Sequence, residues 1–226
     1  MSDGKGARRG GFISFEGIDG AGKSTHVGAC VAWLRTRGEQ VVLSREPGGS
    51  PLAEMLRQLL LKEEMQPQTE TLLAFAARSD HLHRVIRPAL LAGQWVVCDR
   101  FTDSTFAYQG GGSGVDPTWL GKLEAEVQAG LNPDRTYLFD LPVETAERRR
   151  AAVRVADRFE GRDADYFDRV RQAYLSRVAA DPSRFRVLDA TASPEQITEW
   201  LMQDLEEFYT SREQGGAAGA VHGVPR

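Results

Sequence analysis

The stretch FISFEGIDGAGKST, residues Phe12 to Thr25, decides the fold of this chain. It begins with a short apolar run typical of a buried strand and continues into a glycine-rich loop before an amphipathic segment. The loop fits the pattern GxxxxGK[S/T] at Gly17, Gly22, Lys23 and Ser24. In that pattern the backbone N–H groups of a loop and of a helix N-terminus converge on phosphate oxygens. A dinucleotide-binding fingerprint fits less well, because Thr25 stands where a third glycine or alanine is expected. The stretch therefore predicts a loop that binds a nucleoside triphosphate.

Each residue of this loop is a candidate for the triphosphate site. We expect Lys23 to reach the β- and γ-phosphates and the Ser24 hydroxyl to ligate Mg²⁺. The full predicted ATP site is Gly17, Ile18, Asp19, Gly20, Ala21, Gly22, Lys23, Ser24 and Thr25. The motif alone leaves open a switch GTPase, a motor-type ATPase and a small-molecule kinase. A GTPase needs a guanine-reading NKxD, and the nearest string, NPDR at Asn132, lacks the lysine.

Strand-like and helical segments alternate along the rest of the chain. Four further short apolar runs with β-branched or aromatic residues lie at Gln40–Leu43, Gln94–Cys98, Thr136–Phe139 and Phe185–Leu188. Together with the first run they predict an α/β protein of three layers. Its doubly wound, five-stranded parallel sheet carries helices on both faces, as in the P-loop NTPase fold. A ligand of such a sheet binds at the carboxyl ends of the strands.

The helical segments have recognisable boundaries. Ser50 with Pro51, and Asp116 with Pro117, are expected N-caps followed by proline in the first turn, and SPEQ at Ser193 is a capping box. A long helical pattern from about Gln68 to Leu91 contains Pro88, which should kink it locally. Buried faces are expected along the first and last helices, at Val27, Cys30, Val31 and Leu34 and at Ile197, Leu201, Leu205 and Phe208.

Composition limits the class of protein. We expect one domain at residues 11–212, with a flexible N-terminus at 1–10 and a disordered tail at 213–226. A net charge of -4 disfavours a nucleic-acid partner, and no apolar run approaches the roughly 18 residues that cross a membrane. The N-terminal residues do not resemble a secretion signal. Cys30 and Cys98 lack metal-ligand spacing, so reduced thiols in a cytoplasmic protein are expected.

Three further stretches resemble the thymidylate kinase family, in that family's order. They are REPGGSPLAEMLRQLLL, CDRFTDSTFAYQGGG and RVADRFEGRDADYFDRVRQAYL, and the resemblance extends from Phe12 to about Tyr209. It implies that ATP and Mg²⁺ serve the phosphorylation of dTMP to dTDP, a step toward dTTP. Small-molecule nucleotides would then be the ligands, and a homodimer through the helix that includes Arg78 is expected from the family.

The resemblance assigns roles around the point of phosphoryl transfer. Asp99 would belong to the Mg²⁺ and water shell, and Arg100 would bridge the donor and acceptor phosphates. Electrostatic positioning of this kind is most of phosphoryl-transfer catalysis. Asp19 would hold the acceptor's 3′-hydroxyl. A salt bridge at the end of a strand is the structural alternative for Asp99 and Arg100.

On the acceptor side, Arg45 and Pro47 belong to a loop that in the family contacts the monophosphate, and Pro47 matches a position that is often cis. Arg78 would read a carbonyl of the base, and Tyr108 would stack below the deoxyribose and disfavour a 2′-hydroxyl. The residues expected to meet the pyrimidine and sugar also include Ser104, Thr105 and Gln109. Without the family pattern, a capped helix with a buried tyrosine would be the preferred explanation of Tyr108. An arginine on the surface would explain Arg78 equally well.

One position departs from the family. Relatives usually carry a phenylalanine four residues before the arginine that reads the base, where this chain has Ala74, and Phe75 follows it. A shift of one residue turns a helical side chain by about 100°. Phe75 is therefore expected either beside the base pocket or in the core.

A late arginine-rich segment, residues 150–164, resembles the family's lid. Arg154 and Arg158 lie four apart on one helical face and could close over the triphosphate. Family members carry a catalytic arginine either in the P-loop or in the lid, and Gly20 at the P-loop position implies the lid here. A solvated basic helix end is the alternative, and it is our interpretation of Arg148–Arg150.

The expected catalytic residues are therefore Lys23, Arg100, Asp19, Arg154 and Arg158. Two rival functions stay open at this stage. One is another pyrimidine nucleoside monophosphate kinase or a deoxynucleoside kinase. The other is a nucleotide-binding regulatory module without turnover.

Overall fold

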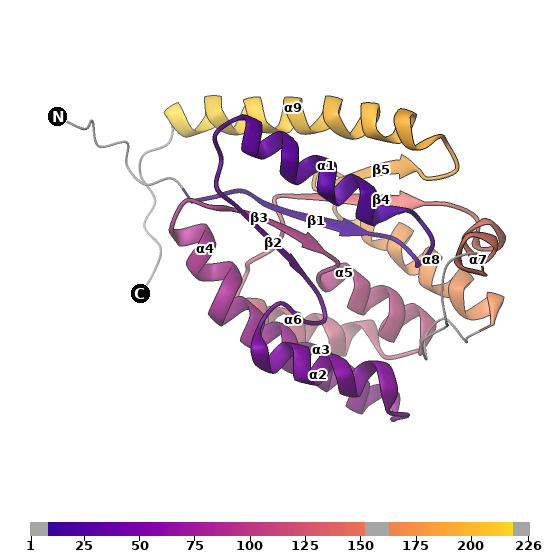
Figure 1. Cartoon of the computed structure of the whole chain (residues 1–226). Coiled ribbons are helices and arrows are strands. Elements are labelled where there is room, and N and C mark those ends of the chain that lie inside the picture. Colours follow the sequence, from indigo (N-terminus) through magenta and orange to yellow (C-terminus); the bar gives the residue numbers. More distant parts are fainter. Residues whose placement is uncertain (1–8, 152–162, 219–226) are drawn as a thin grey trace.

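The computed structural model describes residues 9–151 and 163–218, and within them five parallel strands form one sheet. The strands are β1 (Phe12–Glu16), β2 (Val41–Arg45), β3 (Trp95–Asp99), β4 (Arg135–Asp140) and β5 (Phe185–Asp189). Their order is β2-β3-β1-β4-β5, with every neighbouring pair parallel (Figure 1). All five predicted strands are confirmed, and each ends one or two residues later than the apolar run that indicated it.

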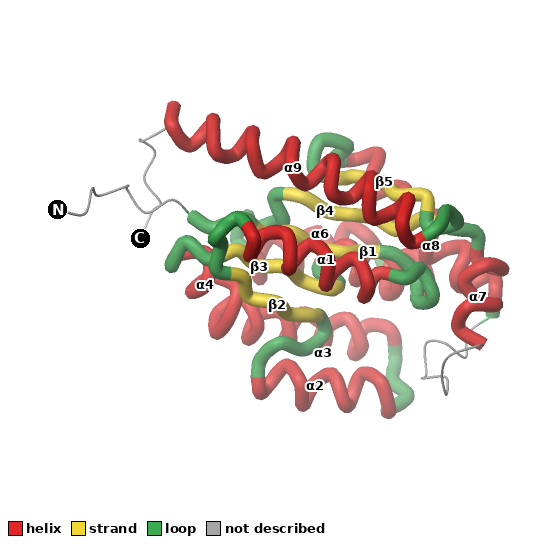
Figure 2. Tube along the Cα trace, turned by 45° about the horizontal axis from the view of Figure 1, so that its top comes forward, coloured by secondary structure: helices red, strands yellow, loops and turns green. Residues whose placement is uncertain are grey.

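Helices cover both faces of the sheet, so the doubly wound fold is confirmed. On one face lie α1 (Lys23–Thr36) and α9 (Pro194–Ala218), side by side in both ribbon views (Figure 2). The helices on the other side are α3 (Pro67–His81), α4 (Arg87–Leu91), α6 (Pro117–Gln128) and α8 (Ala164–Ala180). Helix α2 (Pro51–Lys62) packs against α3. Helix α5 (Thr102–Thr105) continues into the π-helical segment η2 (Phe106–Gly112), and α7 (Val143–Ala151) follows β4.

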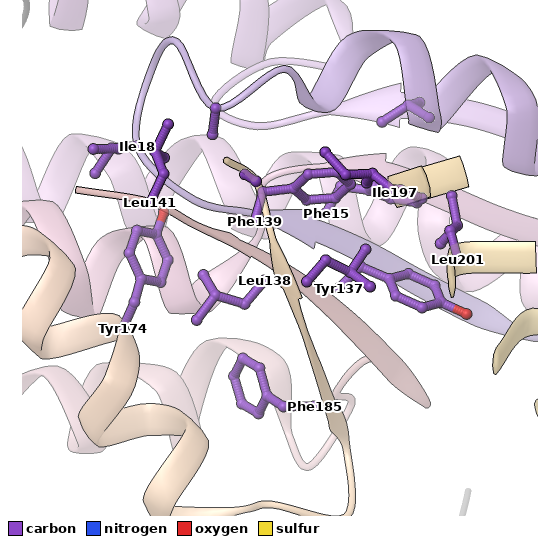
Figure 3. Packing of buried hydrophobic residues seen from close by; sticks show 14 of the residues in the cluster. Phe15, Ile18, Tyr137, Leu138, Phe139, Leu141, Tyr174, Phe185, Ile197 and Leu201 are labelled. Carbon is purple, nitrogen blue, oxygen red and sulfur yellow. The ribbon is translucent and has the colours of Figure 1, made fainter. Parts of the chain in front are cut away.

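The core between the sheet and α1 holds the glycine loop in place. The predicted buried face of α1, Val27, Cys30, Val31 and Leu34, is confirmed. It packs in one cluster with Phe15, Tyr137 and Phe139 of the sheet and with Ile197 and Leu201 of α9 (Figure 3). Burial of each large apolar side chain contributes about 1.5–3 kcal/mol. The start of α1 is thus fixed relative to the strand ends.

The long helical pattern before β3 is interrupted, as expected, but in a particular way. A π-helical segment, η1 (Leu82–Ile86), separates α3 from α4, and Pro88 lies in the first turn of α4. Proline has no N–H to offer the carbonyl four residues earlier, and its ring crowds that carbonyl. The wider turns of η1, just before the proline, accommodate both the missing hydrogen bond and the crowded carbonyl.

The described residues extend past both expected terminal boundaries. Helix α9 continues to Ala218, beyond residue 213, where the tail was expected to begin, and Arg212 near its end forms an ion pair with Asp134 at 3.1 Å. Residues 219–226 lie outside the described part. At the other end, Arg9 also pairs with Asp134, at 2.9 Å, and the Gly10 N–H donates to Leu90 O. The last two residues of the expected flexible N-terminus are therefore anchored, and residues 1–8 lie outside the described part.

The register brings the predicted site to one edge. Asp99 stands beside Phe15 on one side and Arg45 on the other, so the residues that follow β1, β2 and β3 emerge together. The chain runs from β1 to β2 and β3 on one side and to β4 and β5 on the other, which makes β1 the topological switch point. Among the described residues no helix has the length and apolar character needed to cross a membrane.

Candidate active site

The glycine loop turns through backbone conformations that other residues rarely adopt. Gly17, Gly20 and Gly22 have φ angles of 133°, 85° and 84°. A Cβ at Gly17 would lie 2.5 Å from the Phe139 carbonyl oxygen, so strand β4 also requires glycine there. Gly22 is the N-cap of α1, which begins at Lys23. The loop therefore has the strand, turn and helix context that a phosphate-binding loop requires.

A cavity of about 650 Å³ opens beside this loop at the carboxyl edge of the sheet. It brings together most of the predicted site from segments far apart in the sequence. The predicted residues on its wall are Asp19, Gly20, Gly22, Lys23, Ser24, Thr25, Arg45, Pro47, Arg78, Asp99, Arg100, Ser104, Thr105, Tyr108 and Gln109. Of the other predicted residues, Ile18 and Ala21 are buried in the core, and Gly17 lies at the base of the loop.

Lys23 lies along its own loop. Its Nζ donates to the carbonyl oxygens of Gly17 at 2.9 Å and Ile18 at 3.2 Å, and its side chain is buried. Burial and the nearby Arg100 lower the pKa of Lys23 to about 8. At neutral pH the ammonium group is therefore still mainly protonated and lies where a bound phosphate could take over its hydrogen bonds.

Asp99 offers an unsatisfied oxygen to the cavity. Its Oδ1 is buried and has no hydrogen-bond partner within the described residues. Ser24, at the start of α1, lies on the wall of the same cavity. A carboxylate and a hydroxyl are ligand types that Mg²⁺ prefers, and an orphaned buried oxygen is costly unless something satisfies it. The chemistry of the two residues therefore fits a divalent cation, and their role as its ligands stays a prediction.

Arg100 forms the centre of a charged cluster with two other predicted residues. Its Nη2 donates to Asp19 Oδ1 at 2.8 Å and to Tyr108 Oη at 3.2 Å, and its guanidinium lies 5.0 Å from the centre of the Tyr108 ring. Burial alone would raise the pKa of Asp19, but Arg100 and Lys23 outweigh it and hold the pKa below its ordinary value. Asp19 is thus an anion that spans from the P-loop toward the end of β3.

Arg78 is fixed on the opposite wall of the cavity. Its Nε donates to Glu46 Oε2 at 2.7 Å and its Nη2 to Thr105 Oγ1 at 2.8 Å. The rings of Phe75 and Phe101 lie 5.0 and 5.1 Å from the guanidinium carbon. Its Nη1 is buried and has no hydrogen-bond partner in the described part of the chain. The side chain therefore holds one unsatisfied donor, at a residue that lines the cavity.

The surroundings of Arg78 settle the open question about Phe75. Phe75 packs in a small core cluster with Val115 and Leu120 and does not lie on the cavity wall, where Ala74 stands instead. Because of the one-residue shift, the phenylalanine ring packs against the Arg78 guanidinium in the core, and the small side chain of Ala74 lies on the cavity wall. The Glu46–Pro47 peptide bond is cis, as the family resemblance implied.

Two further arginines, Arg45 and Arg57, line the cavity. Arg45 is exposed and forms an ion pair with Glu54 at 3.0 Å. Arg57, which sequence reasoning missed, lines the cavity, and its Nη1 donates to Pro47 O at 2.8 Å. Its spacing of three residues from Glu54 on α2 could have indicated their shared face. Deeper in the cavity, Gln109 donates from Nε2 to Glu70 at 2.7 Å.

The last part of the predicted site is only partly described. Arg149 of α7 lines the cavity and donates to Ala190 O at 2.8 Å, so its assignment to a solvated face is wrong, whereas Arg148 is exposed. The reason is a long-range partner, the Ala190 carbonyl just after β5, which lies 41 positions from Arg149 in the sequence. Arg154 and Arg158 lie in 152–162, outside the described residues, with most of the expected lid at 150–164.

Sequence reasoning also missed Glu16, the last residue of β1. It is fully buried, and its oxygens accept hydrogen bonds from the Phe101 N–H at 2.7 Å, from Ser104 Oγ at 2.5 Å and from Tyr174 Oη at 3.0 Å. Burial and the nearby Asp103 raise the pKa of Glu16 to about 7. A charged residue that ends an otherwise apolar strand was the available signal.

A phosphate-binding loop at the switch point of a parallel sheet, with a buried lysine and an arginine-lined cavity beside it, defines a P-loop nucleotide-binding protein. The particular family follows from comparison: the family model described as Thymidylate kinase matches residues 15–201, and the chain belongs to the thymidylate kinase family.

Individual relatives agree with this membership. The chain is 58% identical over 191 residues to the thymidylate kinase of Cupriavidus pinatubonensis, covering 84% of this chain and 94% of that relative. It is 51% identical over 200 residues to the thymidylate kinase of Methylobacillus flagellatus, covering 88% of this chain and 98% of that relative. The crystal structure of thymidylate kinase from Ehrlichia chaffeensis superposes with a TM-score of 0.71 at 32% identity, covering 87% of this chain and 99% of that one.

Proposed function

We propose that this protein transfers the γ-phosphoryl group of ATP to dTMP, giving dTDP and ADP. The observation that carries the proposal is the continuity of one cavity from the P-loop lysine to Arg78, whose Nη1 has no hydrogen-bond partner among the described residues. A phosphoryl transferase must hold donor and acceptor in a single space, because its catalysis rests on positioning the two. A regulatory module would not need the second, arginine-lined half.

The donor binds at the P-loop. The N–H groups at the start of α1 meet the phosphates, and Lys23 transfers its hydrogen bonds from Gly17 and Ile18 to the β- and γ-phosphate oxygens. Ser24 and Asp99 would hold Mg²⁺, which would supply positive charge to the phosphates. Their exposed hydroxyl and unsatisfied carboxylate oxygen support this assignment.

Arg100 acts between the two substrates. It lies at the end of β3, beside the P-loop residue Asp19 and beside Tyr108, so it can contact both phosphates during transfer. Asp19 holds the acceptor's 3′-hydroxyl. No general base is required, because a phosphate monoester oxygen is already a nucleophile. Lid residues Arg154 and Arg158 remain proposed sources of further positive charge at the donor.

The acceptor lies against the opposite wall. Arg45 and Arg57 meet its phosphate, and Arg45 exchanges its ion pair with Glu54 for that contact. The free Nη1 of Arg78 donates to a carbonyl of the base. Tyr108 limits the space for a 2′-hydroxyl, and Ser104, Thr105 and Gln109 complete the pocket. The two free cysteines are both buried, which suits work in the cytoplasm.

The test is an ADP-release assay with ATP and a panel of acceptors: dTMP, dUMP, UMP and thymidine. We expect the highest kcat/KM with dTMP and a loss of at least about 10³-fold in Lys23→Ala, because the donor loses its main charge partner. Preference for another monophosphate, or for thymidine, would support the alternative of a different pyrimidine nucleotide or deoxynucleoside kinase. Wild-type activity in Lys23→Ala would contradict the catalytic account altogether.

The proposal includes a homodimer. Helix α2 exposes Leu52, Met55 and Leu59 along one face, and Leu72 of the adjoining α3 is exposed as well. Exposed apolar side chains gathered on neighbouring helices are typical of an interface. Sedimentation analysis should give twice the chain mass of 24.9 kDa for the wild type and a monomer for Met55→Glu. A monomeric wild type at micromolar concentration would rule the dimer out.

A further inference from the structure

Tyr174 is a buried tyrosine of α8 whose hydroxyl reaches the back of Arg100. Its Oη accepts a hydrogen bond from Arg100 Nη1 at 3.1 Å and donates to Glu16 Oε2 at 3.0 Å. The side chain is only 1% exposed, and Figure 3 shows the ring rising from α8 toward Ile18 and Leu141. Tyr174 does not line the cavity. It therefore contacts Arg100 without lying on the wall where the substrates are proposed to bind.

Ser104 makes a second link of the same kind. Its Oγ accepts from Arg100 Nη1 at 3.2 Å, donates to Glu16 Oε2 at 2.5 Å and lies 2.8 Å from Tyr174 Oη. One amino group of Arg100 thus faces two hydroxyls with a single carboxylate behind them. The other amino group, Nη2, faces Asp19 and Tyr108 on the cavity side. The guanidinium is held from both sides in one orientation.

Arg100 needs such support for two physical reasons. Its φ of 68° lies in the left-handed region, which is strained for a non-glycine residue and persists only where surrounding contacts determine it. Its long, flexible side chain also has rotamer entropy to lose. If the guanidinium is already fixed before the phosphates bind, the free-energy cost of ordering the Arg100 side chain does not reduce the stabilisation of the transition state.

We propose that Tyr174 is a positioning residue for Arg100, linking it to the buried carboxylate of Glu16. Tyr174 acts through Arg100 and does not touch the reacting atoms. The inference rests on the proposed phosphoryl transfer, in which Arg100 contacts both phosphates. It adds a contribution from helix α8 to the site, supplied by a residue 74 positions away from Arg100 in the sequence.

The first experiment removes only the hydroxyl. Tyr174→Phe should lower kcat with dTMP about 10- to 100-fold while the KM for ATP changes less than about threefold, because the P-loop is untouched. The matched control is Tyr137→Phe in β4, a tyrosine equally buried in the core, whose kcat should stay within about twofold of wild type. A wild-type kcat in Tyr174→Phe would overturn the proposal.

A double-mutant cycle separates positioning from general structural support. In an Arg100→Lys background the Tyr174→Phe change should cost less than about threefold, because the residue through which Tyr174 acts is already altered. An undiminished loss in that background would overturn the proposal. If Tyr174→Phe fails to fold, Glu16→Gln, which neutralises the carboxylate behind the same hydroxyl, is the second variant. It should lower kcat about 10- to 100-fold alone and less than about threefold in the Arg100→Lys background.

The wild-type acceptor panel keeps this test distinct from that of the proposed function. If the wild type turns over another acceptor in place of dTMP, the proposed substrate is wrong, and the cycle is run with that acceptor. If the wild type phosphorylates dTMP but Tyr174→Phe matches it, only the positioning role fails.

Discussion

Two buried glutamates lie at the carboxyl edge of the sheet, and each supports an arginine of the active site by a different route. Glu46, after β2, contacts Arg78 directly at 2.7 Å and His81 at 2.9 Å. Glu16, at the end of β1, reaches Arg100 only through the hydroxyls of Ser104 and Tyr174. The two side chains are almost equally inaccessible to solvent.

The difference in contacts leads to opposite pKa shifts. Burial alone would raise the pKa of Glu46, but Arg78 and His81 outweigh it, and the pKa falls below its ordinary value. For Glu16 burial dominates, Asp103 adds repulsion, and the hydroxyls and Arg100 compensate only partly, so its pKa rises to about 7. Direct contact with a cation, and not burial as such, therefore decides whether a buried carboxylate stays charged.

The largest effect is expected from Glu46→Gln, which tests the direct ion pair between Glu46 and Arg78. It leaves Arg78 as a buried cation without its charge partner, so we expect a loss of about 3–5 kcal/mol in the free energy of unfolding at pH 7. Urea denaturation measures it. The matched control is Glu54→Gln, which removes the exposed partner of Arg45 and should cost no more than about 1 kcal/mol. Equal losses in the two variants would contradict the account of Glu46.

The second test, Glu16→Gln, concerns pH. The folded-state pKa of about 7 exceeds the ordinary 4.5, so the stability contributed by protonated Glu16 is complete below about 4.5 and is lost as the pH rises through 7. Between pH 4.5 and 8 the wild type should therefore lose up to about 3 kcal/mol through this residue, and the glutamine variant should not. The charged and titratable groups around Glu16 include Asp103, Arg100, Tyr174, Lys23 and Cys98.

Urea denaturation of both proteins across this pH range provides the measurement. Other groups titrate in both proteins alike, so the difference between the two free energies of unfolding isolates Glu16. That difference should shift in favour of the variant as the pH rises. A difference that does not depend on pH would mean that Glu16 is charged throughout, like Glu46.

Much of the fold could be predicted because its determinants are local. Each strand was visible as a short apolar run, and the buried face of α1 followed from the spacing of Val27, Cys30, Val31 and Leu34. The P-loop was predictable for the same reason, since its residues are contiguous. Asp99 and Arg100 could be placed because they end a strand next to it. These predictions needed no knowledge of long-range contacts.

What escaped prediction depends on tertiary packing. Glu16 and Tyr174 are 158 positions apart, and no pattern in either segment indicates that they share a hydrogen bond. Phe75 could have lain in the pocket or in the core, and only the packing of Val115 and Leu120 decides between them. Arg149 lines the cavity and donates to the Ala190 carbonyl, a partner 41 positions away in the sequence. Helical phase and the positions of the five strands were predictable here, whereas side-chain partners across the sheet edge were not.

A smaller perturbation, Ser104→Ala, tests the link behind Glu16. Ser104 donates to Oε2 at 2.5 Å and lowers the pKa of Glu16, so its loss should move the pKa upward. We expect about 1–2 kcal/mol of destabilisation at pH 8, where the carboxylate needs the donor, and less at pH 5, where it is protonated. Urea denaturation at the two pH values gives the answer. A larger loss at pH 5 than at pH 8 would reverse the assumed direction of the hydrogen bond.

The smallest expected effect comes from an ion pair that solvent reaches. Arg84 of η1 pairs with Asp80 one helical turn away at 2.7 Å, a distance equal to that between Arg78 and Glu46, but the Arg84 side chain is 60% exposed. In Arg84→Ala, water and the Ser50 hydroxyl still satisfy Asp80, so we expect a loss of about 0.3–0.5 kcal/mol that fades at about 1 M salt. Urea denaturation at low and high salt measures it. A loss above about 1.5 kcal/mol that survives high salt would show that contact distance, and not desolvation, sets the strength of these pairs.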